Sequence, residues 1–475
     1  MEITAPTEAL RLFAFHLMNE MFPNGSLEGS LSLDSVREGN FFVSTARFGE
    51  HVFSASAAFE EHFTEKRTEN VACGKALFLL FSALGGAHVP YGTLVGVRPV
   101  KIAVFYRSHK LGPIETKARL VRDYCMSDEK AELLCTLAEI ESQTECSLQK
   151  NDAMLYLSIP FCPSRCRYCS FISHSAPSQL ALLDEYFERM SDEIQETAEL
   201  FSETGRTLRA VYLGGGTPGL LSAEQLYRLF TQLKRDFSLA SNTEVTAELG
   251  RPDTITDEKC RALSEHGISR ICINPQSLND EVLSVNLRAH TAADFYRAYE
   301  CAKRAGIRTI NTDLIAGLVG DTPEGFLRTV GEILTLSPEN LTIHALCKKR
   351  ASSEDESPDA DLDHRWFDAM QTADRACIKN AYAPYYLYRQ KNTIANLENL
   401  GYTKADHTCI YNIAMMEDLC DIFAVGAGAM TKLRRKTDDG YQMIRLPAYK
   451  YPSEYLADLE KGRRNRVQVK ALCME

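Results

Sequence analysis

The stretch Met154-Leu-Tyr-Leu-Ser-Ile-Pro-Phe-Cys162-Pro-Ser-Arg-Cys166-Arg-Tyr-Cys169 decides how the rest of the chain is interpreted. Residues 154–159 form a short apolar run, which is typical of a buried strand. Three cysteines follow at C-x3-C-x2-C spacing. Because one loop carries all three thiols, they can point toward a common centre. The sequence therefore predicts a metal-binding loop directly after a buried strand.

The three thiols suit an iron–sulfur cluster. Each of the four irons of a [4Fe–4S] cluster takes one further ligand, normally a cysteine thiolate. Three local thiolates leave one iron open, and an open iron can chelate the amino and carboxylate groups of a small molecule and pass it an electron. A cluster with four protein ligands would need another cysteine nearby, but the next one along the chain is Cys260.

Two other interpretations of the cysteines stay open. A structural zinc ion could use the three cysteines with His174 as a fourth ligand, although closed zinc sites usually use two well-separated ligand pairs. The group could also consist of small core residues that lie close in sequence by chance. Of the three interpretations, an open [4Fe–4S] cluster accounts best for the spacing.

Composition narrows the class of protein. A chain of 475 residues predicts two or three domains, and 45% apolar with 25% charged residues is typical of a folded soluble protein. The formal charge of −11 argues against broad binding to nucleic acid, which needs a basic face. No secretory signal is visible, and the most apolar run, 76–84, is too short for a membrane span. We expect a cytoplasmic protein whose fifteen cysteines stay reduced.

From residue 154 onward, short β-rich runs alternate with helical patterns. Six such units imply a parallel sheet with right-handed crossovers, and six rather than eight units predict a partial barrel that is open on one side. Active sites on such sheets lie at the carboxyl ends of the strands. The predicted strands are 154–159, 209–213, 243–249, 268–274, 308–316 and 340–345, and the predicted helices are 179–201, 222–236, 257–266, 291–305 and 323–335.

Three domains are expected. Residues 1–150 predict an α+β accessory domain that begins with a helix over 8–21, and residues 151–350 hold the barrel. An acidic, proline-containing stretch at 351–361 reads as an exposed connector. The remainder of 351–475 mixes helix and strand, and we expect it to cover the substrate.

A glycine-rich loop follows the second predicted strand, in Val211-Tyr-Leu-Gly214-Gly215-Gly216-Thr217-Pro218. Glycines let the backbone approach a ligand closely, and their N–H groups can bind a carboxylate or a phosphate. The loop also fits the dinucleotide pattern G-x-G-x-x-G, with Asp236 at a tolerable distance. In that interpretation the pattern would lie on the second β–α unit, beside a cysteine loop and with Pro218 inside the turn. This context argues against a dinucleotide site.

Together these motifs closely resemble the radical S-adenosylmethionine (SAM) superfamily. The similarity continues through Glu244-Val-Thr-Ala-Glu248, Ile273-Asn-Pro-Gln276-Ser, Leu287-Arg288-Ala-His290 and 310–318. Within the superfamily the chain resembles the oxygen-independent coproporphyrinogen III dehydrogenase (oxidase) family. Its HemZ-type branch similarly has a long N-terminal extension and segments like those at 96–99 and 385–392.

The resemblance implies a partial (β/α)6 barrel in which a [4Fe–4S] cluster binds one or two molecules of SAM. Reductive cleavage of SAM gives a radical that abstracts a hydrogen from a propionate side chain, which then loses CO2. Two such steps convert coproporphyrinogen III to protoporphyrinogen IX in oxygen-independent haem biosynthesis. The implied partners are a tetrapyrrole substrate and an electron donor such as flavodoxin or ferredoxin. From charge and hydropathy we expect no nucleic acid and no membrane span.

The resemblance also implies roles for individual residues. Cys162, Cys166 and Cys169 would hold the cluster. No catalytic side chain is assigned, because the cofactor supplies the hard chemistry. The positions implied to contact SAM, or to line a second SAM or substrate position, are Tyr156, Tyr168, Gly215, Gly216, Thr217, Glu248, Gln276, Arg288, Asp313, Cys347 and Met430.

One departure separates two functions. Well-characterised members of the dehydrogenase family carry a fourth cysteine two residues after the third, and Phe171 stands there in this chain. Phenylalanine at this place is also a feature of haem chaperones related to the family, but these usually begin close to their first strand. A different radical reaction on a tetrapyrrole is a further alternative. A substrate with four carboxylates should need cations, and the candidates are Lys348, Lys349, Arg350, Arg389 and Lys391.

Overall fold

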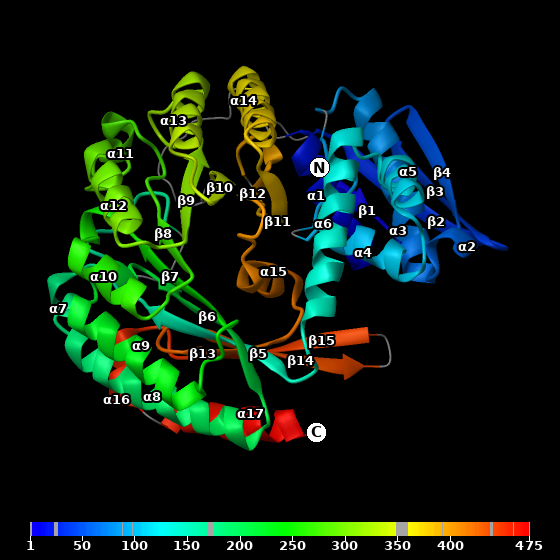
Figure 1. Ribbon diagram of the computed structural model, residues 1–475. Coiled ribbons are helices and arrows are strands. Elements are labelled where there is room, and N and C mark those ends of the chain that lie inside the picture. The colour runs from blue at the N-terminus through cyan, green and yellow to red at the C-terminus, as the bar shows by residue number, and fades with distance from the viewer. Residues whose placement is uncertain are drawn as a thin grey trace. The chain divides into compact units, whose positions relative to one another are not determined.

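The structure is a computed structural model that describes residues 2–22, 27–87, 89–96, 98–169, 174–347, 360–391, 393–437, 440–458 and 460–474 (Figure 1). Its contacts divide the chain into two compact units. The N-terminal unit comprises Met1–Ser142, Cys347–Phe367 and Leu387–Glu398, and the barrel unit comprises Gln143–Leu346, Asp368–Tyr386 and Asn399–Glu475. Residues 351–475 are thus shared between the units, and their expected role as a covering domain stays a prediction.

The N-terminal unit contains a four-stranded sheet packed against helices. Its strands are arranged in the order β1 (Glu2–Thr4), β2 (Ser30–Glu38), β3 (Phe41–Phe48) and β4 (His51–Ala58). Alternate apolar residues of the sheet, such as Leu31 and Leu33, are buried in one core with residues of α1 (Glu8–Met21) and α3 (Glu65–Ala83). The helix predicted over 8–21 is confirmed, and the apolar run at 76–84 lies in or directly after the buried helix α3.

Three shorter helices, α2 (Phe59–His62), α4 (Val100–Ser108) and α5 (Pro113–Tyr124), also belong to this unit, and α6 (Asp128–Ser147) runs on into the barrel unit. Buried charges inside the unit are paired. Lys130 donates to the carboxylate of Glu398, and both side chains are almost fully buried. Arg389 lies 3.3 Å from the Glu20 carboxylate and donates to the Leu94 carbonyl. Arg389 is therefore committed to the packing of this unit, which corrects its proposed role as a free substrate-binding cation.

The barrel unit contains the six predicted parallel strands as neighbours. They are β5 (Asp152–Ile159), β6 (Thr207–Gly215), β7 (Glu244–Gly250), β8 (Arg270–Ile273), β9 (Thr309–Ala316) and β10 (Asn340–Ala345). The five predicted helices form between them and cover the outer face of the curved sheet (Figure 1). These are α8 (Leu183–Glu203), α9 (Ala223–Phe237), α10 (Asp257–Glu265), α12 (Ala292–Arg304) and α13 (Pro323–Leu336).

Local chemistry explains where these helices begin. Ser222 and Thr291 each form a capping box, in which the hydroxyl accepts from the third helical N–H and that residue's side chain binds the cap's own N–H. Thr256 and Thr322 also accept from a backbone N–H in the first turn of their helices. Such caps stabilise helices by about 1 kcal/mol each. The predicted partial (β/α)6 barrel is confirmed.

Five further strands extend the sheet beyond the predicted six. On one side, β12 (Glu398–Thr403) pairs antiparallel with β10 and is followed by β11 (Ala383–Arg389). On the other side, β13 (Asp421–Val425) pairs parallel with β5 and is followed by β14 (Met430–Thr437) and β15 (Gly440–Pro447). The remaining helices are α7 (Pro177–Leu180), α11 (Asp280–Val285), α14 (Ala360–Lys379), α15 (Ile410–Glu417), α16 (Pro452–Ala457) and α17 (Glu460–Met474). No helix in the described parts of the chain has the length and apolarity needed to span a membrane.

Candidate functional site

The cysteine loop leaves the carboxyl end of β5 and carries two of its thiols in buried positions. Cys162 is 9% exposed and Cys166 is 8% exposed, whereas Cys169 is half-buried. The Cys162 N–H donates to the His174 carbonyl at 3.0 Å, and the Cys169 N–H donates to the Cys166 carbonyl at 3.2 Å. These bonds hold the loop as a compact turn directly above the strand.

The loop that follows β8 and α11 braces the cysteine loop. Arg288 Nη1 lies 3.7 Å from Cys166 Sγ and donates to the Tyr168 hydroxyl at 3.0 Å. The Arg167 N–H donates to the Asn286 carbonyl at 3.0 Å. Leu287 adopts a φ of 56°, a left-handed conformation that side chains other than glycine rarely take. The Arg288 guanidinium therefore lies beside Cys166 and fixes the loop that carries this thiol.

The glycine loop after β6 lies against the same cysteines. Thr217 Oγ1 donates to Cys162 Sγ at 3.3 Å. A Cβ atom on Gly216 would stand 2.5 Å from the Phe161 carbonyl oxygen and 3.0 Å from Cys162 Sγ. Gly215 has a φ of +111°, and a Cβ atom there would stand 2.9 Å from the backbone of Ile159. Both positions therefore require glycine because the neighbouring loop fills the space of a side chain, and the predicted approach to a ligand stays a prediction.

The inner face of the barrel is polar near the carboxyl ends of its strands. The Tyr212 hydroxyl donates to Glu248 Oε2 at 2.9 Å, and Asn311 Nδ2 donates to Asp313 Oδ1 at 2.8 Å. His344 Nε2 lies 3.7 Å from Asp313 Oδ2. Burial first, and then the charge of Asp313, raise the pKa of Glu248 to about 7, while the Tyr212 hydrogen bond and His344 oppose the shift. This face offers hydrogen bonds and charge to a polar ligand.

Three tyrosine rings stack along the same inner face. The ring centroids of Tyr156 and Tyr212 are 6.3 Å apart, and those of Tyr212 and Tyr411 are 4.6 Å apart. Burial raises the pKa of Tyr156 and of Tyr411 above the ordinary value, so both phenols stay protonated. Together the rings form an apolar wall beside the polar one, which suits a ligand with a flat apolar part and a polar end.

Several buried polar atoms near the cysteine loop lack a hydrogen-bond partner among the described residues. Two that lie on the barrel side of the loop are Gln276 Oε1 and Asn274 Oδ1, and Arg288 Nε and His174 Nε2 lack a partner as well. Gln276 also has a φ of +67°, and its backbone bonds to β9 through the Asp313 carbonyl and the Ile315 N–H. Buried polar atoms normally have a hydrogen-bond partner. An unfavourable backbone conformation persists only where the surrounding structure fixes it, and such places are common at ligand sites. Both observations indicate that a polar ligand completes this part of the site.

The arrangement fits a [4Fe–4S] cluster better than a zinc ion. Among the described residues, no three His, Cys, Asp or Glu side chains gather closely enough to hold a single metal ion. In a cluster each thiolate binds a different iron, so its ligands need not meet at one point. Three thiols, a cationic brace and a glycine cradle match a cluster with an open iron and a small polar ligand beside it.

Several predicted residues lie elsewhere or outside the described residues. Cys347 is assigned to the N-terminal unit, where its thiol donates to the Lys391 carbonyl at 3.2 Å. Met430 begins β14 and is 39% exposed. Asp313 and Tyr156 do lie on the inner face, but within β9 and β5 rather than at the ends of these strands. Phe171 and the proposed cations at 348–350 are outside the described residues.

Sequence reasoning missed several residues that the fold brings to the inner face. Asn399 of β12 accepts from the Ala345 N–H at 3.2 Å and lies 3.3 Å from His344 Nδ1. Tyr411 comes from α15, a helix that was not predicted. The only available signal was alternation along the predicted strand 340–345, which places His344 on the same face as Thr342.

Comparison with known proteins agrees with this site. Residues 156–333 match the Radical SAM superfamily. The oxygen-independent coproporphyrinogen-III oxidase-like protein HemZ of Bacillus subtilis is 35% identical over 364 residues, which are 74% of this chain and 72% of that protein. The heme chaperone HemW of Haemophilus influenzae is 29% identical over 305 residues, 64% of this chain and 75% of that protein.

Among solved structures, the coproporphyrinogen III oxidase HemN of Escherichia coli, described as a radical SAM enzyme, aligns with a TM-score of 0.49 and 22% identity. The alignment covers 65% of this chain and 74% of that one. The match to HemZ spans more than two thirds of both chains. The chain belongs to the radical SAM superfamily and, within it, to the coproporphyrinogen III oxidase-like family, which uses a [4Fe–4S] cluster and SAM.

Proposed function

We propose that this protein is a radical SAM enzyme that oxidatively decarboxylates coproporphyrinogen III to protoporphyrinogen IX. The observation that carries the proposal is the meeting of the cysteine loop, the glycine loop and a polar inner face at one end of the sheet. The HemZ relative, an oxidase-like protein, supports this choice because it matches this chain at higher identity than HemW.

Each part of the site has a separate task in this proposal. Cys162, Cys166 and Cys169 hold the cluster, and Arg288 fixes the loop that carries them. When bound, the cluster and SAM supply an adenosyl radical that takes a hydrogen atom from the substrate. Gly215 and Gly216 keep the glycine loop packed against the cysteine loop, so that its backbone N–H groups can bind SAM there. Glu248 would attract the positive charge of SAM. The inner face positions the propionate, because radical abstraction tolerates little misplacement.

The pKa of Glu248 predicts how SAM binding depends on pH. Since the pKa is raised to about 7, the carboxyl is largely protonated at pH 6 and largely ionised at pH 8. Only the ionised form attracts a cation, so we expect the affinity for SAM to be about tenfold higher at pH 8 than at pH 6. Equilibrium binding of SAM to the cluster-loaded protein across this range measures the effect.

Glu248→Gln is the control for this prediction, because it keeps the shape of the side chain and removes its titration. We expect the variant to bind SAM more weakly at pH 8 and to lose most of the pH dependence. An unchanged slope in the variant would show that another group titrates, and that Glu248 does not hold SAM.

The second candidate function is that of a haem chaperone, which the HemW relative favours. The two functions differ in what SAM cleavage needs. An oxidase should form 5′-deoxyadenosine in proportion to coproporphyrinogen III and release CO2. A chaperone should bind haem stoichiometrically and form no 5′-deoxyadenosine that depends on the porphyrinogen.

Asp313→Ala tests the enzyme interpretation at one residue. Asp313 faces His344 on the inner face, and its removal should leave the cysteine loop intact. We expect cluster content and SAM binding to be retained, and turnover of coproporphyrinogen III to fall about 100-fold, since even a 1 Å misplacement can cost this much. Anaerobic incubation followed by mass spectrometry for loss of carboxyl groups measures turnover. Tight haem binding with SAM cleavage indifferent to coproporphyrinogen III would favour the chaperone.

A further inference from the structure

The cysteine loop has an outer side as well as the side that meets Thr217 and Arg288. On the outer side, Phe161 and His174 form an isolated parallel bridge, and the His174 N–H donates to the Pro160 carbonyl at 2.9 Å. The His174 ring contacts Tyr451 edge-on at a centroid distance of 5.4 Å. Tyr451 is 41% exposed, so among the described residues its ring lies between His174 and the surface.

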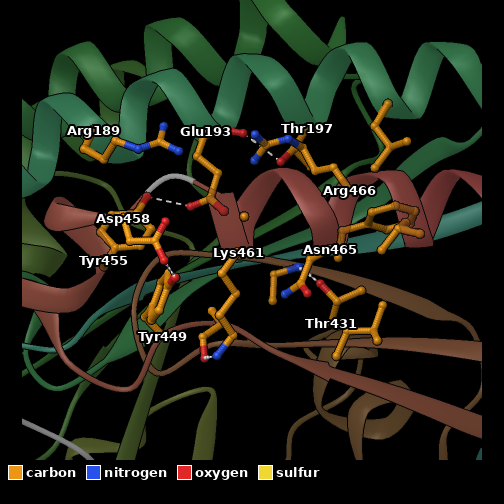
Figure 2. Close-up of a pocket in the computed structure, with 17 residues that line it drawn as sticks. Arg189, Glu193, Thr197, Thr431, Tyr449, Tyr455, Asp458, Lys461, Asn465 and Arg466 are labelled. Carbon is orange, nitrogen blue, oxygen red and sulfur yellow. Dashed lines mark hydrogen bonds between the residues drawn. The ribbon is translucent and has the colours of Figure 1, made fainter.

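Packed aromatic rings connect the same loop to a nearby pocket. Phe161, which precedes Cys162, contacts the buried ring of Tyr186 at 5.1 Å, and Tyr186 contacts Tyr455 at 5.0 Å. The Tyr186 hydroxyl is fixed by the Ser158 carbonyl and the Ala427 N–H, each at 2.8 Å. Tyr455 lines a pocket of about 50 Å³ between α8 and α17 (Figure 2). None of the predicted site residues lines this pocket.

Several cations lie around the segment Tyr449–Tyr451, which runs between the pocket and the cysteine loop. Arg165 and Lys450 are exposed, and the charges of both act on the His174 ring. Lys461 Nζ lies 4.7 Å from the centre of the Tyr449 ring, and both residues line the pocket (Figure 2). The charge of Arg464 acts on the same tyrosine.

Three acids, Glu454, Asp458 and Glu460, lie among these cations. Tyr449 and the Glu460 N–H both donate to the Asp458 carboxylate, and Glu460 pairs with Arg463 at 2.9 Å. Glu454 of α16 remains as an exposed carboxylate. The cations Arg165, Lys450, Lys461, Arg463 and Arg464 outnumber these three acids, on a chain whose formal charge is −11.

We propose that an acidic one-electron donor protein of the flavodoxin or ferredoxin class docks on this outer surface. We call it the donor face and define it by Arg165, Lys450, Tyr451, Lys461 and Arg464. The donor loses one electron and the cluster gains it, and no bond forms or breaks. The inference rests on the proposed function only in requiring a reducible cluster, and it holds for any radical SAM reaction.

The charge distribution explains why an acidic donor needs such a face. A chain with strong net negative charge repels an acidic partner, whereas a local cationic surface steers it to one place and accelerates association about 10- to 1,000-fold. Exposed tyrosine and arginine, as found here, are enriched in protein–protein interfaces relative to the rest of the surface. The opposite side of the cysteine loop stays free for SAM and substrate, so reduction and substrate binding use different sides.

A double charge reversal tests the donor face. In Arg165→Glu with Lys450→Glu, reduction of the reconstituted protein by reduced flavodoxin should slow about tenfold or more at low ionic strength, as measured by stopped-flow absorbance. Added salt should narrow the difference from the wild type. Reduction by dithionite, which needs no docking surface, should be unchanged, and this also shows that the variant folds and holds its cluster. Tyr451→Ala should weaken flavodoxin binding several-fold.

Arg308→Glu with Arg328→Glu is the matched control, because both arginines are exposed on the barrel unit outside the donor face. It should reduce at the wild-type rate. Equal slowing in both double variants, or no slowing in the donor-face variant, would overturn the inference. Calorimetric binding of oxidised flavodoxin to the cluster-free protein gives a second readout. Absence of iron uptake would count against the proposed function, and this second readout would still decide the donor face.

Discussion

Replacing Cys166 by serine should abolish the cluster, reducing the iron content from about four atoms per chain to nearly none. Cys166 is buried and lies beside the Arg288 guanidinium, so its thiol is held where it must serve as a ligand. A serine hydroxyl is a hard ligand that stays protonated at neutral pH, and it does not replace a thiolate on iron. The electron paramagnetic resonance signal of the reduced cluster, and its change on adding SAM, should disappear together.

Cys146→Ser is the control for this experiment, because Cys146 is an exposed cysteine of α6. It should take up iron as the wild type does. If the wild-type protein bound zinc tightly and took up no iron, or if Cys166→Ser kept its iron, the cluster assignment would be wrong. The same measurements apply to Cys162 and Cys169.

Gly216→Ala should damage the site although it adds a single methyl group. The new Cβ atom would stand 2.5 Å from the Phe161 carbonyl oxygen and 3.0 Å from Cys162 Sγ, so the cysteine loop must shift. Overpacking of this kind costs about 1–3 kcal/mol of unfolding free energy. Because the displaced atoms include a cluster ligand, we also expect lower iron content and weaker SAM binding. Urea unfolding and iron analysis measure the two effects separately.

Gly331→Ala makes the same chemical change where nothing lies within 4 Å of the added Cβ atom. Gly331 is exposed within α13, and alanine is a better helix former than glycine by about 0.5–1 kcal/mol. This variant should be at least as stable as the wild type and should keep full iron content. If Gly216→Ala behaved like Gly331→Ala, the close approach of the two loops would be refuted.

Local patterns explain how much of the fold was predictable. Apolar runs bounded by helix caps such as Ser222 and Thr291 identified all six parallel strands and the five helices between them. The strands that extend the sheet were missed because their neighbours are distant in sequence. For example, β13 pairs with β5 through Ile422 and Met154, and no local periodicity records that contact.

The candidate site, like the fold, has features that local sequence predicts and features that depend on contacts distant in sequence. Cysteine spacing and the glycine loop predicted the ligand set, because three thiols on one short loop and three successive glycines have few structural alternatives. By contrast, the approach of Arg288 to Cys166 and that of His344 to Asp313 depend on how separate β–α units meet. The contact of Asn399 with His344 depends on a strand that joins the sheet from the far end of the chain.

The sequence by itself determined the family, the cofactor chemistry and the parallel barrel, since these follow from short-range spacing and periodicity. Only the tertiary structure decided which polar groups face one another on the inner side, and that Arg389 is buried in a pair with Glu20 rather than free for a substrate. It alone also placed Tyr186 and Tyr451 behind the cysteine loop. The physical reason is that a side chain's burial and partners are set by residues distant in sequence, whose positions are fixed only when the whole sheet assembles.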